Sequence, residues 1–409
     1  MPFRDFLLAN LRWLSGGFLL CLFSSFGQTF FIALSGGQIR QEYGLSNGQF
    51  GGLYMLATLA SALTLPFMGR MVDRRSVAAT ALVVMPMLAL AATLMAFSGQ
   101  VLMLGLALYL LRLFGQGMMT HTALTAMGRW FSGHRGRAVS LAALGHQTGE
   151  ALLPLAMVWL HAMVGWRMSW LVSAAVIVLV ALPAIYRLMR VERTPLVDDL
   201  PERRRVTRHW TRREVLGDPI YWIMLVGTLA PGFIGTAIFF HQAYLLDLRG
   251  WPADAFASAL LVMAGMTVAS ALTTGWLIDR YGAFRLLPVF LLPLSLACFA
   301  LAGIAEPIGI FIFMGLLGWS YGISSTLLGA LWPEVYGTLH LGSVRSVTVA
   351  MMVFSSALGP GITGWLIDWQ VSYLDQLRVM GVYCLLAALV MVFVSRQLGL
   401  RLTPGSSAR

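Results

Sequence analysis

The feature that most constrains this chain is a series of long apolar stretches that carry no charge. Val77–Phe97 and residues 286–303, for example, contain no Asp, Glu or Arg. A helix needs roughly 20 apolar residues to cross a bilayer, where its backbone polar groups must bond inside the helix. Charged residues make up 11% of the chain, against about 25% in soluble proteins. The sequence therefore predicts an all-α protein that crosses a membrane many times.

Twelve such spans are predicted, with approximate ends. They are residues 13–35, 47–68, 77–97, 101–124, 137–160, 167–188, 220–244, 254–278, 285–303, 308–330, 345–367 and 376–395. The first span is longer than the apolar core of about 7–15 residues in a signal peptide, so we expect it to be retained. The predicted parts are a six-helix bundle over 1–188, a basic linker over 189–219, a second six-helix bundle over 220–396 and a tail over 397–409.

The positions of the basic residues predict the orientation of the spans. All 28 are arginine, and the formal net charge is +11. They gather at the N-terminus, in alternate loops, in the linker and in the tail: Arg4 and Arg12; Arg70, Arg74 and Arg75; Arg129, Arg135 and Arg137; Arg190, Arg193, Arg203, Arg204, Arg205, Arg208, Arg212 and Arg213; Arg396, Arg401 and Arg409. The positive-inside rule places both termini and the linker in the cytoplasm of a bacterial cell, with the spans in its inner membrane. Because the arginines gather in the loops on one side of the membrane, we expect them to contact the lipid bilayer and not a nucleic acid.

A short loop occurs twice, once in each half of the chain. Its shared positions are Gly69, Asp73 and Arg74 in the first copy and Gly275, Asp279 and Arg280 in the second, 206 residues later. Both copies stand at the same step of a six-span count, which indicates an internal repeat. Residues 275–279 also recur as 364–368, as an inverted repeat inside each half would produce.

In these loops the chain resembles the major facilitator superfamily, whose signature reads Gly-x-x-x-Asp-Arg-x-Gly-x-Arg. The first copy departs from it at Ser76, where the second glycine would stand. Arg112, Gln116 and Gly117 in the fourth span are similar to the family's Arg-x-x-x-Gln-Gly element. The resemblance implies two six-helix bundles around a central cavity that work by alternating access. It also implies that the loops act as a conformational latch; the alternative is that they only set topology.

Two charged residues lie deep inside predicted spans. Arg112 lies about 15 Å from the periplasmic end of the fourth span, and Glu150 about 20 Å from the cytoplasmic end of the fifth. Unpaired charge there costs several kcal/mol, so we expect the two residues to pair. His146 lies one turn from Glu150 on the same face. We interpret the three as a proton-coupling or substrate-binding cluster; the alternative is a static ion pair between spans.

The resemblance places further polar residues along the central cavity, which spans 1, 4, 7 and 10 would line. Besides Arg112, the candidates for substrate or proton coupling are Gln28, Gln116, Tyr321 and His241. Pro231 and Gly232 are expected to break the seventh span, as suits a helix that moves.

These observations favour one function and leave two alternatives. The chain lacks lysine and so any Gly-x-x-x-x-Gly-Lys loop for ATP, and no metal or catalytic motif is visible. We therefore expect that the protein is not an enzyme and binds no cofactor or metal. We expect it to be a monomeric, proton-coupled secondary transporter of a small organic solute, such as a carboxylate. The alternatives are efflux of hydrophobic, drug-like compounds by proton antiport and a non-transporting membrane sensor. The family's fifth span often carries Gly-Pro, and Gly149-Glu150 in its place argues against antiport.

Overall fold

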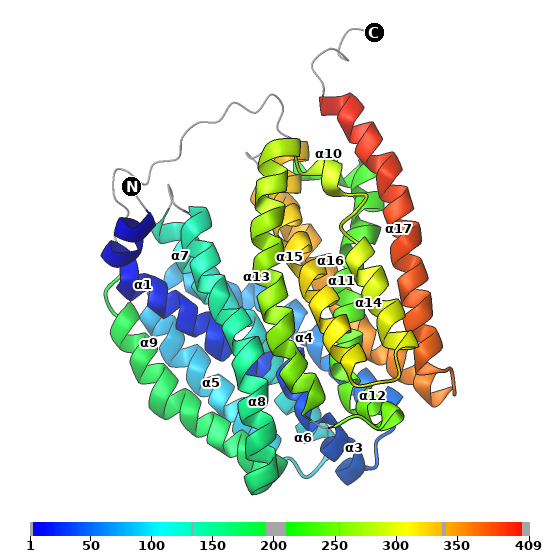
Figure 1. Ribbon diagram of the computed structural model, residues 1–409. Helices are drawn as coiled ribbons and strands as arrows, with labels where there is room; N and C mark the ends of the chain where they lie inside the picture. Colours follow the sequence, from blue (N-terminus) through cyan, green and yellow to red (C-terminus); the bar gives the residue numbers. More distant parts are fainter. Residues whose placement is uncertain (1–2, 132–134, 194–209, 253, 338–340, 403–409) are drawn as a thin grey trace. The chain divides into compact units, whose positions relative to one another are not determined.

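The structure is a computed structural model that describes residues 3–131, 135–193, 210–252, 254–337 and 341–402. Within these ranges every regular element is a helix (Figure 1). The chain divides into two compact units, Met1–Arg203 and Arg204–Arg409. The division falls inside the predicted linker, of which residues 194–209 lie outside the described ranges.

The helices follow one another closely in each unit, labelled as in Figure 1. Unit 1 contains α1 (Phe3–Phe23), η1 (Ser24–Gly27), α2 (Thr29–Ile32), η2 (Ala33–Ser35), α3 (Gly36–Tyr43), α4 (Asn47–Arg74), α5 (Val77–Phe97), α6 (Val101–Leu110), η3 (Leu111–Met119), α7 (Thr120–Trp130), α8 (Arg135–Val176), η4 (Ile177–Ala181) and α9 (Leu182–Met189). Unit 2 contains α10 (Arg212–Leu216), α11 (Pro219–Phe240), α12 (Gln242–Arg249), α13 (Ala255–Tyr281), η6 (Phe284–Leu286), α14 (Leu292–Gly303), α15 (Ile308–Tyr336), α16 (Leu341–Asp368) and α17 (Tyr373–Leu402). Of the η segments, η1, η2 and η6 are 3₁₀-helices, and η3 and η4 are π-helices.

The described helices account for the predicted spans. Ten segments are long and apolar enough to cross a membrane. One of them, Arg137–Met189, covers two predicted spans and is interrupted at Gly165, whose φ of 78° is a conformation that glycine adopts without strain. The predicted ninth span is the shorter apolar helix α14. Divided at Gly165 and with α14 counted, the described segments give the twelve predicted spans.

Backbone features repeat between the two units with the spacing of the signature loops. Gly44 ends α3 with a φ of 64°, and Gly250 ends α12 with a φ of 63°. Pro154 lies inside α8, and Pro360 lies inside α16. The partners in each pair are 206 residues apart, as the two loops are. The internal repeat is therefore present in the backbone as well as in the sequence.

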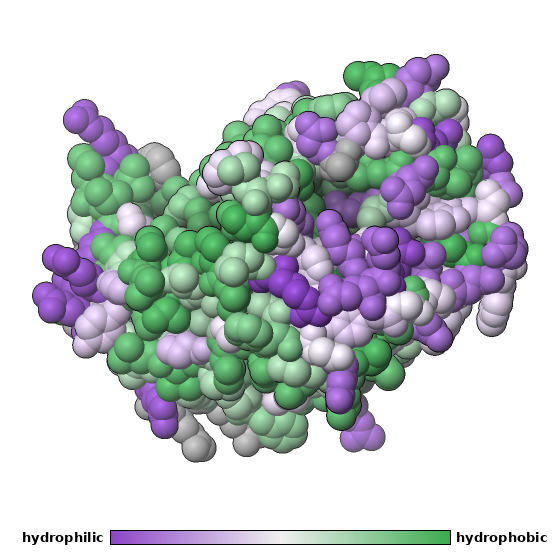
Figure 2. Space-filling view, turned by 90° about the horizontal axis from the view of Figure 1, so that it is seen from below, coloured by the Kyte–Doolittle hydropathy of each residue, from purple (hydrophilic) through white to green (hydrophobic). Residues whose placement is uncertain are grey.

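Large apolar side chains are exposed along the sides of the helices. On α17 they recur every three or four residues, at Val379, Val382, Leu386, Leu389 and Phe393. An exposed apolar stripe of this period suits a helix whose outer face lies in lipid. Figure 2 looks at one end of the helices, where hydrophilic residues gather beside hydrophobic ones.

Glycines allow the helices inside each unit to touch backbone to backbone. A Cβ at Gly145 of α8 would overlap the carbonyl oxygen of Phe18 in α1. A Cβ at Gly318 of α15 would likewise overlap the carbonyl of Met263 in α13. Small residues at such contacts are the usual means of close packing in membranes, where lipid removes the hydrophobic drive for helix association.

The expected break at Pro231 and Gly232 is wrong, because α11 runs without interruption through both. A proline inside a helix removes one N–H and frees the carbonyl four residues earlier. Neighbouring side chains can satisfy such a carbonyl inside a membrane. In α16, for example, Pro360 frees the carbonyl of Ser356, which accepts a hydrogen bond of 2.8 Å from the hydroxyl of Thr236.

Replacing Gly145 by alanine should destabilise unit 1. The new methyl group meets a backbone oxygen that cannot move aside, so α8 must shift from α1, at about 1–3 kcal/mol for overpacking. We expect a lower thermal unfolding midpoint in detergent for Gly145→Ala. The matched control is Gly265→Ala in α13, where a Cβ meets nothing within 4 Å. Equal unfolding midpoints for the two variants would contradict this account of the contact between α1 and α8.

Candidate functional site

The first span is broken near its middle, which the sequence reading did not anticipate. α1 ends at Phe23, η1 follows, and Gln28 is extended, with φ −85° and ψ 154°, before α2 begins. At this break the backbone meets η3 of the fourth span. A Cβ at Gly27 would overlap the carbonyl oxygen of Leu111 and lie 2.7 Å from the Cα of Gly115. Only a pair of glycines allows these two segments of the backbone to cross so closely.

The segment that faces the break is itself irregular. η3 is a nine-residue π-helix that contains Arg112 and Gln116. A π-helical turn is a rare departure from α-helical geometry that occurs frequently at functional sites. Two irregularities, one in each partner, therefore meet at the place where the predicted arginine stands.

Arg112 is held by the broken segment. Its side chain is buried, with 1% of its surface exposed. One terminal nitrogen donates to the carbonyl of Gly27 at 3.2 Å and to the hydroxyl of Thr29 at 3.3 Å. The guanidinium carbon lies 5.4 Å from the ring centre of Tyr54, whose hydroxyl is 2.8 Å from that of Thr29. Nε of Arg112 has no hydrogen-bond partner in the described part of the chain.

The expected ion pair between Arg112 and Glu150 does not form in this structure. Glu150 is buried on α8, with 7% of its surface exposed. Among the described residues neither side chain has an ion-pair partner within 4.0 Å. The physical reason is the break in the first span, which offers Arg112 a freed carbonyl and a hydroxyl in place of a carboxylate. Tyr54, a partner that sequence reasoning missed, was detectable only as a buried aromatic hydroxyl inside the second span.

The other predicted residues of unit 1 also surround the break. Gln28 lies within it, and the backbone N of Gln116 would be 2.8 Å from a Cβ at Gly27. On α8, the ring of His146 lies 6.0 Å from that of Phe30 in α2, and its Nδ1 has no partner among the described residues. Gly149, next to Glu150, packs directly against Ser25 of η1. The structure thus brings Gln28, Arg112, Gln116, His146 and Glu150 around one irregular segment.

The two predicted residues of unit 2 make contacts between helices. The hydroxyl of Tyr321 in α15 lies against Gly235 of α11, where a Cβ would overlap it. His241 follows α11 and is buried, and its Nε2 lies 2.9 Å from the carbonyl oxygen of Pro360 in α16. Their part in coupling stays a prediction.

The charged groups of the cluster have no counterpart in unit 2. The residues 206 positions after Arg112, His146 and Glu150 are Gly318, Met352 and Ser356. At the positions equivalent to Arg112, His146 and Glu150, unit 2 therefore carries no charged or titratable side chain.

Only part of the predicted latch can be described. Gly69 lies close to His121, whose Nε2 would be 3.2 Å from a Cβ there. The side chains of Asp73, Arg74 and Asp279 lie outside the described parts of the chain. In the second copy, a Cβ at Gly275 would meet nothing within 4 Å, and Arg280 lies over the ring of Trp276 at 5.6 Å.

Two carboxylates that the sequence reading missed hold the backbone at these loops. Glu192 accepts from the N–H of Val77, the first residue of α5, at 3.1 Å, and pairs with Arg129 at 3.4 Å. Glu334 of α15 accepts from the N–H of Ala283 in the second loop at 2.8 Å. The N–H groups at the start of a helix lack partners within it, and the helix dipole attracts negative charge there. The signal in the sequence that could have identified Glu192 and Glu334 is that each is a carboxylate shortly after the end of a predicted span.

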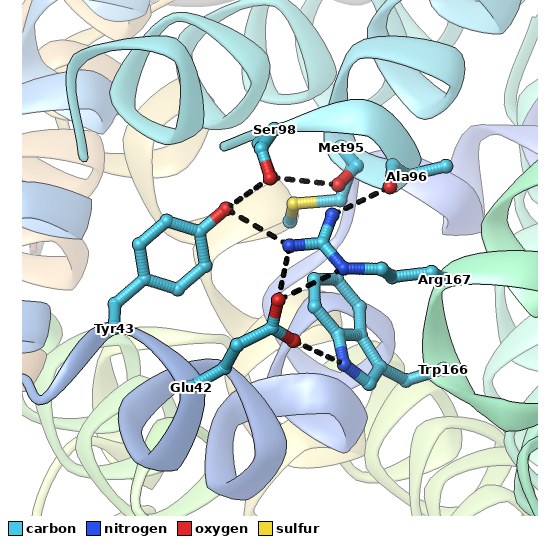
Figure 3. A network of polar contacts seen from close by, with 7 residues as sticks. All are labelled: Glu42, Tyr43, Met95, Ala96, Ser98, Trp166 and Arg167. Atoms are coloured by element: carbon cyan, nitrogen blue, oxygen red, sulfur yellow. Dashed lines mark hydrogen bonds and ion pairs between the residues drawn. The ribbon is translucent and has the colours of Figure 1, made fainter. Parts of the chain in front are cut away.

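A polar network ties three helices of unit 1 together near the end of α3 (Figure 3). Glu42 accepts from Nε of Arg167 at 3.1 Å and from a terminal nitrogen at 2.5 Å, and its second oxygen accepts from the indole N–H of Trp166 at 3.1 Å. Tyr43 donates to Ser98 at 2.6 Å. The hydrogen bond from Arg167 holds the pKa of the Glu42 carboxyl below its ordinary value.

Equivalent helix ends in the two units are capped by arginine. Arg167 donates to the carbonyl of Ala96, beside the end of α5, at 2.6 Å. In unit 2, Arg249 donates to Leu301 and Ala302, near the end of α14, at 3.0 and 2.8 Å. The last carbonyls of a helix lack partners within it, and a cation there is favoured by the dipole. The two arginines do not stand at equivalent positions of the repeat. What the two units share is therefore the need to satisfy the open carbonyls at the end of the helix.

Fold and site together define a multi-pass, all-helical membrane protein with a broken helix at a buried cation. The family model of the major facilitator superfamily matches residues 17–347. The chain therefore belongs to the major facilitator superfamily, and the family indicates a transporter and not an enzyme.

Solved structures of transporters share this fold. A bacterial homologue of the human lysosomal transporter Spinster matches in an inward-facing, unoccupied form, with a TM-score of 0.73, 15% identity and coverage of 97% of this chain and 98% of that one. Its occupied form matches with a TM-score of 0.71 and 17% identity, covering 97% of each chain. A mutant form of the nucleoside transporter NupG matches with a TM-score of 0.63 and 15% identity, covering 95% of this chain and 98% of that one. No curated protein sequence matches.

Because of the network in Figure 3, the stability of the folded protein should vary with pH in the acidic range. Because Arg167 lowers the pKa of Glu42 in the folded protein, the pair stabilises the fold above the ordinary Glu pKa. That stabilisation is lost as the pH falls through the lowered value. We expect Glu42→Gln to unfold at a lower temperature than the parent at about pH 7, and the difference to shrink as the pH falls below the ordinary Glu pKa of about 4.3. Asp375→Asn, which removes a more exposed pair with Arg378, is the control and should show a smaller difference. A Glu42→Gln difference that does not change with pH across the acidic range would argue against the pair.

Proposed function

We propose that this protein is a proton-coupled secondary transporter of a small organic solute that carries a carboxylate or a similar anion. It would work by alternating access in a bacterial inner membrane, with both termini in the cytoplasm. The single observation that carries the proposal is Arg112, a buried cation that has only neutral partners among the described residues.

The partners of Arg112 favour an anionic ligand. Two hydrogen bonds to a carbonyl and a hydroxyl leave Nε without a partner and the positive charge without a counter-charge among the described residues. Burying a charge without a counter-ion is costly. A guanidinium binds carboxylate with two parallel hydrogen bonds, which supply charge and geometry together. A solute carboxylate would offer both to a side chain that the broken first span already holds in place.

Glu150 is proposed as the proton carrier. It is buried, lies beside the same break, and has no cation within 4.0 Å among the described residues. An ionisable side chain inside a membrane is expensive and for that reason usually functional, most often in ion or proton pathways. Alternating exposure to water and burial would let Glu150 take up a proton on one side and release it on the other. His146, one turn away, is proposed to assist.

The break in the first span is proposed as the moving part of the site. In secondary transporters, discontinuous helices commonly form the substrate site, because their freed backbone groups contact the ligand. The carbonyl of Gly27 is such a group, and in this structure it accepts a hydrogen bond from Arg112. The signature loops, together with Glu192 and Glu334, are proposed to bias the equilibrium between the two states.

Replacing Arg112 by glutamine should abolish uptake of carboxylates. The assay is uptake into proteoliposomes over a panel of small carboxylic acids, neutral solutes and hydrophobic drug-like compounds. Arg378→Gln, an exposed arginine of α17, is the matched control and should transport normally. Movement of the hydrophobic compounds alone would favour efflux, and binding of a soluble partner without any transport would favour a sensor. Either result would contradict the anion proposal.

Replacing Glu150 by glutamine should uncouple transport from the proton gradient. The variant cannot carry a proton, so a pH gradient should no longer drive accumulation, while exchange of labelled for unlabelled solute continues. Retained exchange shows that the variant is folded and binds solute. The matched control is Glu306→Gln, an exposed carboxylate between α14 and α15, which should accumulate solute normally. Gradient-driven accumulation by Glu150→Gln would show that another group carries the proton.

A further inference from the structure

Unit 2 contains a groove that has no place in the transport site described above. Its volume is about 350 Å³. It lies between α11, α16 and α17, and its lining residues are Leu229, Ala230, Phe233, Ile234, Ser355, Val379, Met380 and Tyr383. These side chains are apolar apart from two hydroxyls.

The groove is a wedge between α11 and α17. The helices are joined at one end of it, where the hydroxyl of Tyr383 donates to the carbonyl of Val226 at 2.8 Å. Met391 also packs against Gly227, within 3.1 Å of the position of a Cβ there. The lining residues of α11 follow these contacts along the helix, while Val379 of α17, 68% exposed, lies at the other end of the wedge.

The two hydroxyl groups of the lining already donate their protons inside the protein. The hydroxyl of Ser355 donates to the carbonyl of Leu229 at 3.1 Å, and that of Tyr383 is taken by Val226. A polar ligand would lose most of its own hydrogen bonds on entering such a groove, because six of the eight lining side chains are apolar and the two hydroxyls offer only their oxygen lone pairs. The chemistry therefore selects an apolar occupant.

The depth of the groove along α11 indicates that the occupant comes from the lipid bilayer. Leu229 and Ile234 stand about 16 and 9 Å from the end of α11 at Phe240, taking 1.5 Å per residue. The hydrocarbon core of a bilayer is about 30 Å thick, so this is the depth of acyl chains and not of headgroups. Val379 belongs to the exposed apolar stripe of α17, so the groove continues the lipid-facing surface.

The equivalent positions of the sixth span, in unit 1, are closed. The residues 206 positions before Val379, Met380 and Tyr383 are Ser173, Ala174 and Ile177, and all three are buried. The exposure of Val379 in the groove is therefore not a feature that the repeat imposes on both units.

We infer that this groove is a binding site for one acyl chain of a membrane phospholipid, held between α11 and α17. The chain enters from the lipid-facing surface past Val379 and packs against Ala230 and Phe233.

The test is cross-linking with a phosphatidylglycerol that carries a diazirine near the end of one acyl chain. The full-length protein is reconstituted with a small proportion of this lipid, irradiated and digested, and the labelled peptides are identified by mass spectrometry. We expect labelling of 229–234 and 379–383 that unlabelled phosphatidylglycerol displaces at lower amounts than it displaces labelling elsewhere on α17.

Two variants fill the groove in different ways. Ala230→Phe fills its floor, and Val379→Trp covers its mouth from an exposed position that tolerates a large side chain. Both should lose the labelling of the groove. Leu386→Trp, on the same exposed stripe but outside the lining, is the matched control and should keep it.

Three results would overturn the inference. The first is groove labelling no stronger than that around Leu386, as expected of lipid that merely surrounds the protein. The second is unchanged labelling in Val379→Trp, which does not depend on how Ala230→Phe folds. The third is displacement by the hydrophobic compounds of the transport panel but not by phosphatidylglycerol, which would make the groove a solute site.

Discussion

The structure depends on one constraint, which is that backbone polar groups have no water to bond inside a membrane. Where the first span breaks, the carbonyl of Gly27 is freed, and Arg112 donates to it. Where Pro360 interrupts the bonding of α16, Thr236 supplies the missing donor. At the ends of α5 and α14, Arg167 and Arg249 do the same. The placement of the buried cation therefore answers the same physical need that holds the helices together.

The two units share backbone features at equivalent positions but differ at the site, where the first span is broken and its equivalent in unit 2, α11, is continuous. Gly44 and Gly250 end equivalent helices in the same left-handed conformation. Yet the charged cluster exists in unit 1, where Gly318 and Ser356 are the equivalents of Arg112 and Glu150 in unit 2. Unit 2 instead carries the apolar groove of α11 and α17. A repeated fold thus leaves each half free to acquire its own site, because a few side chains, and in unit 1 a local break in the first span, decide the chemistry.

The described ends of the linker are tied down in the same way in each unit. In unit 1, Arg193 donates to the carbonyl of Trp130, the last residue of α7. In unit 2, the N–H of Trp210 donates at 3.0 Å to the carbonyl of Tyr336, the last residue of α15. Trp130 and Tyr336 are 206 residues apart, and each ends the fourth span of its half. Each described end of the linker therefore satisfies a carbonyl that its helix leaves open.

The sequence by itself determined the membrane class, the twelve spans and the repeat, because these follow from long uncharged stretches and from residue types at a fixed spacing. It also singled out Arg112, Glu150 and His146, since charge inside a span is rare enough to stand out. It did not determine the partners. The break at Gln28, the crossing of Gly27 with Gly115, and the hold of Thr29 and Tyr54 on Arg112 join residues from four segments. Pro231, the strongest local signal for a break, left α11 intact, while the first span broke without any proline. Only the tertiary structure decided these points, because a break is stable where a neighbouring helix satisfies the freed backbone, and no local pattern records which neighbour that is.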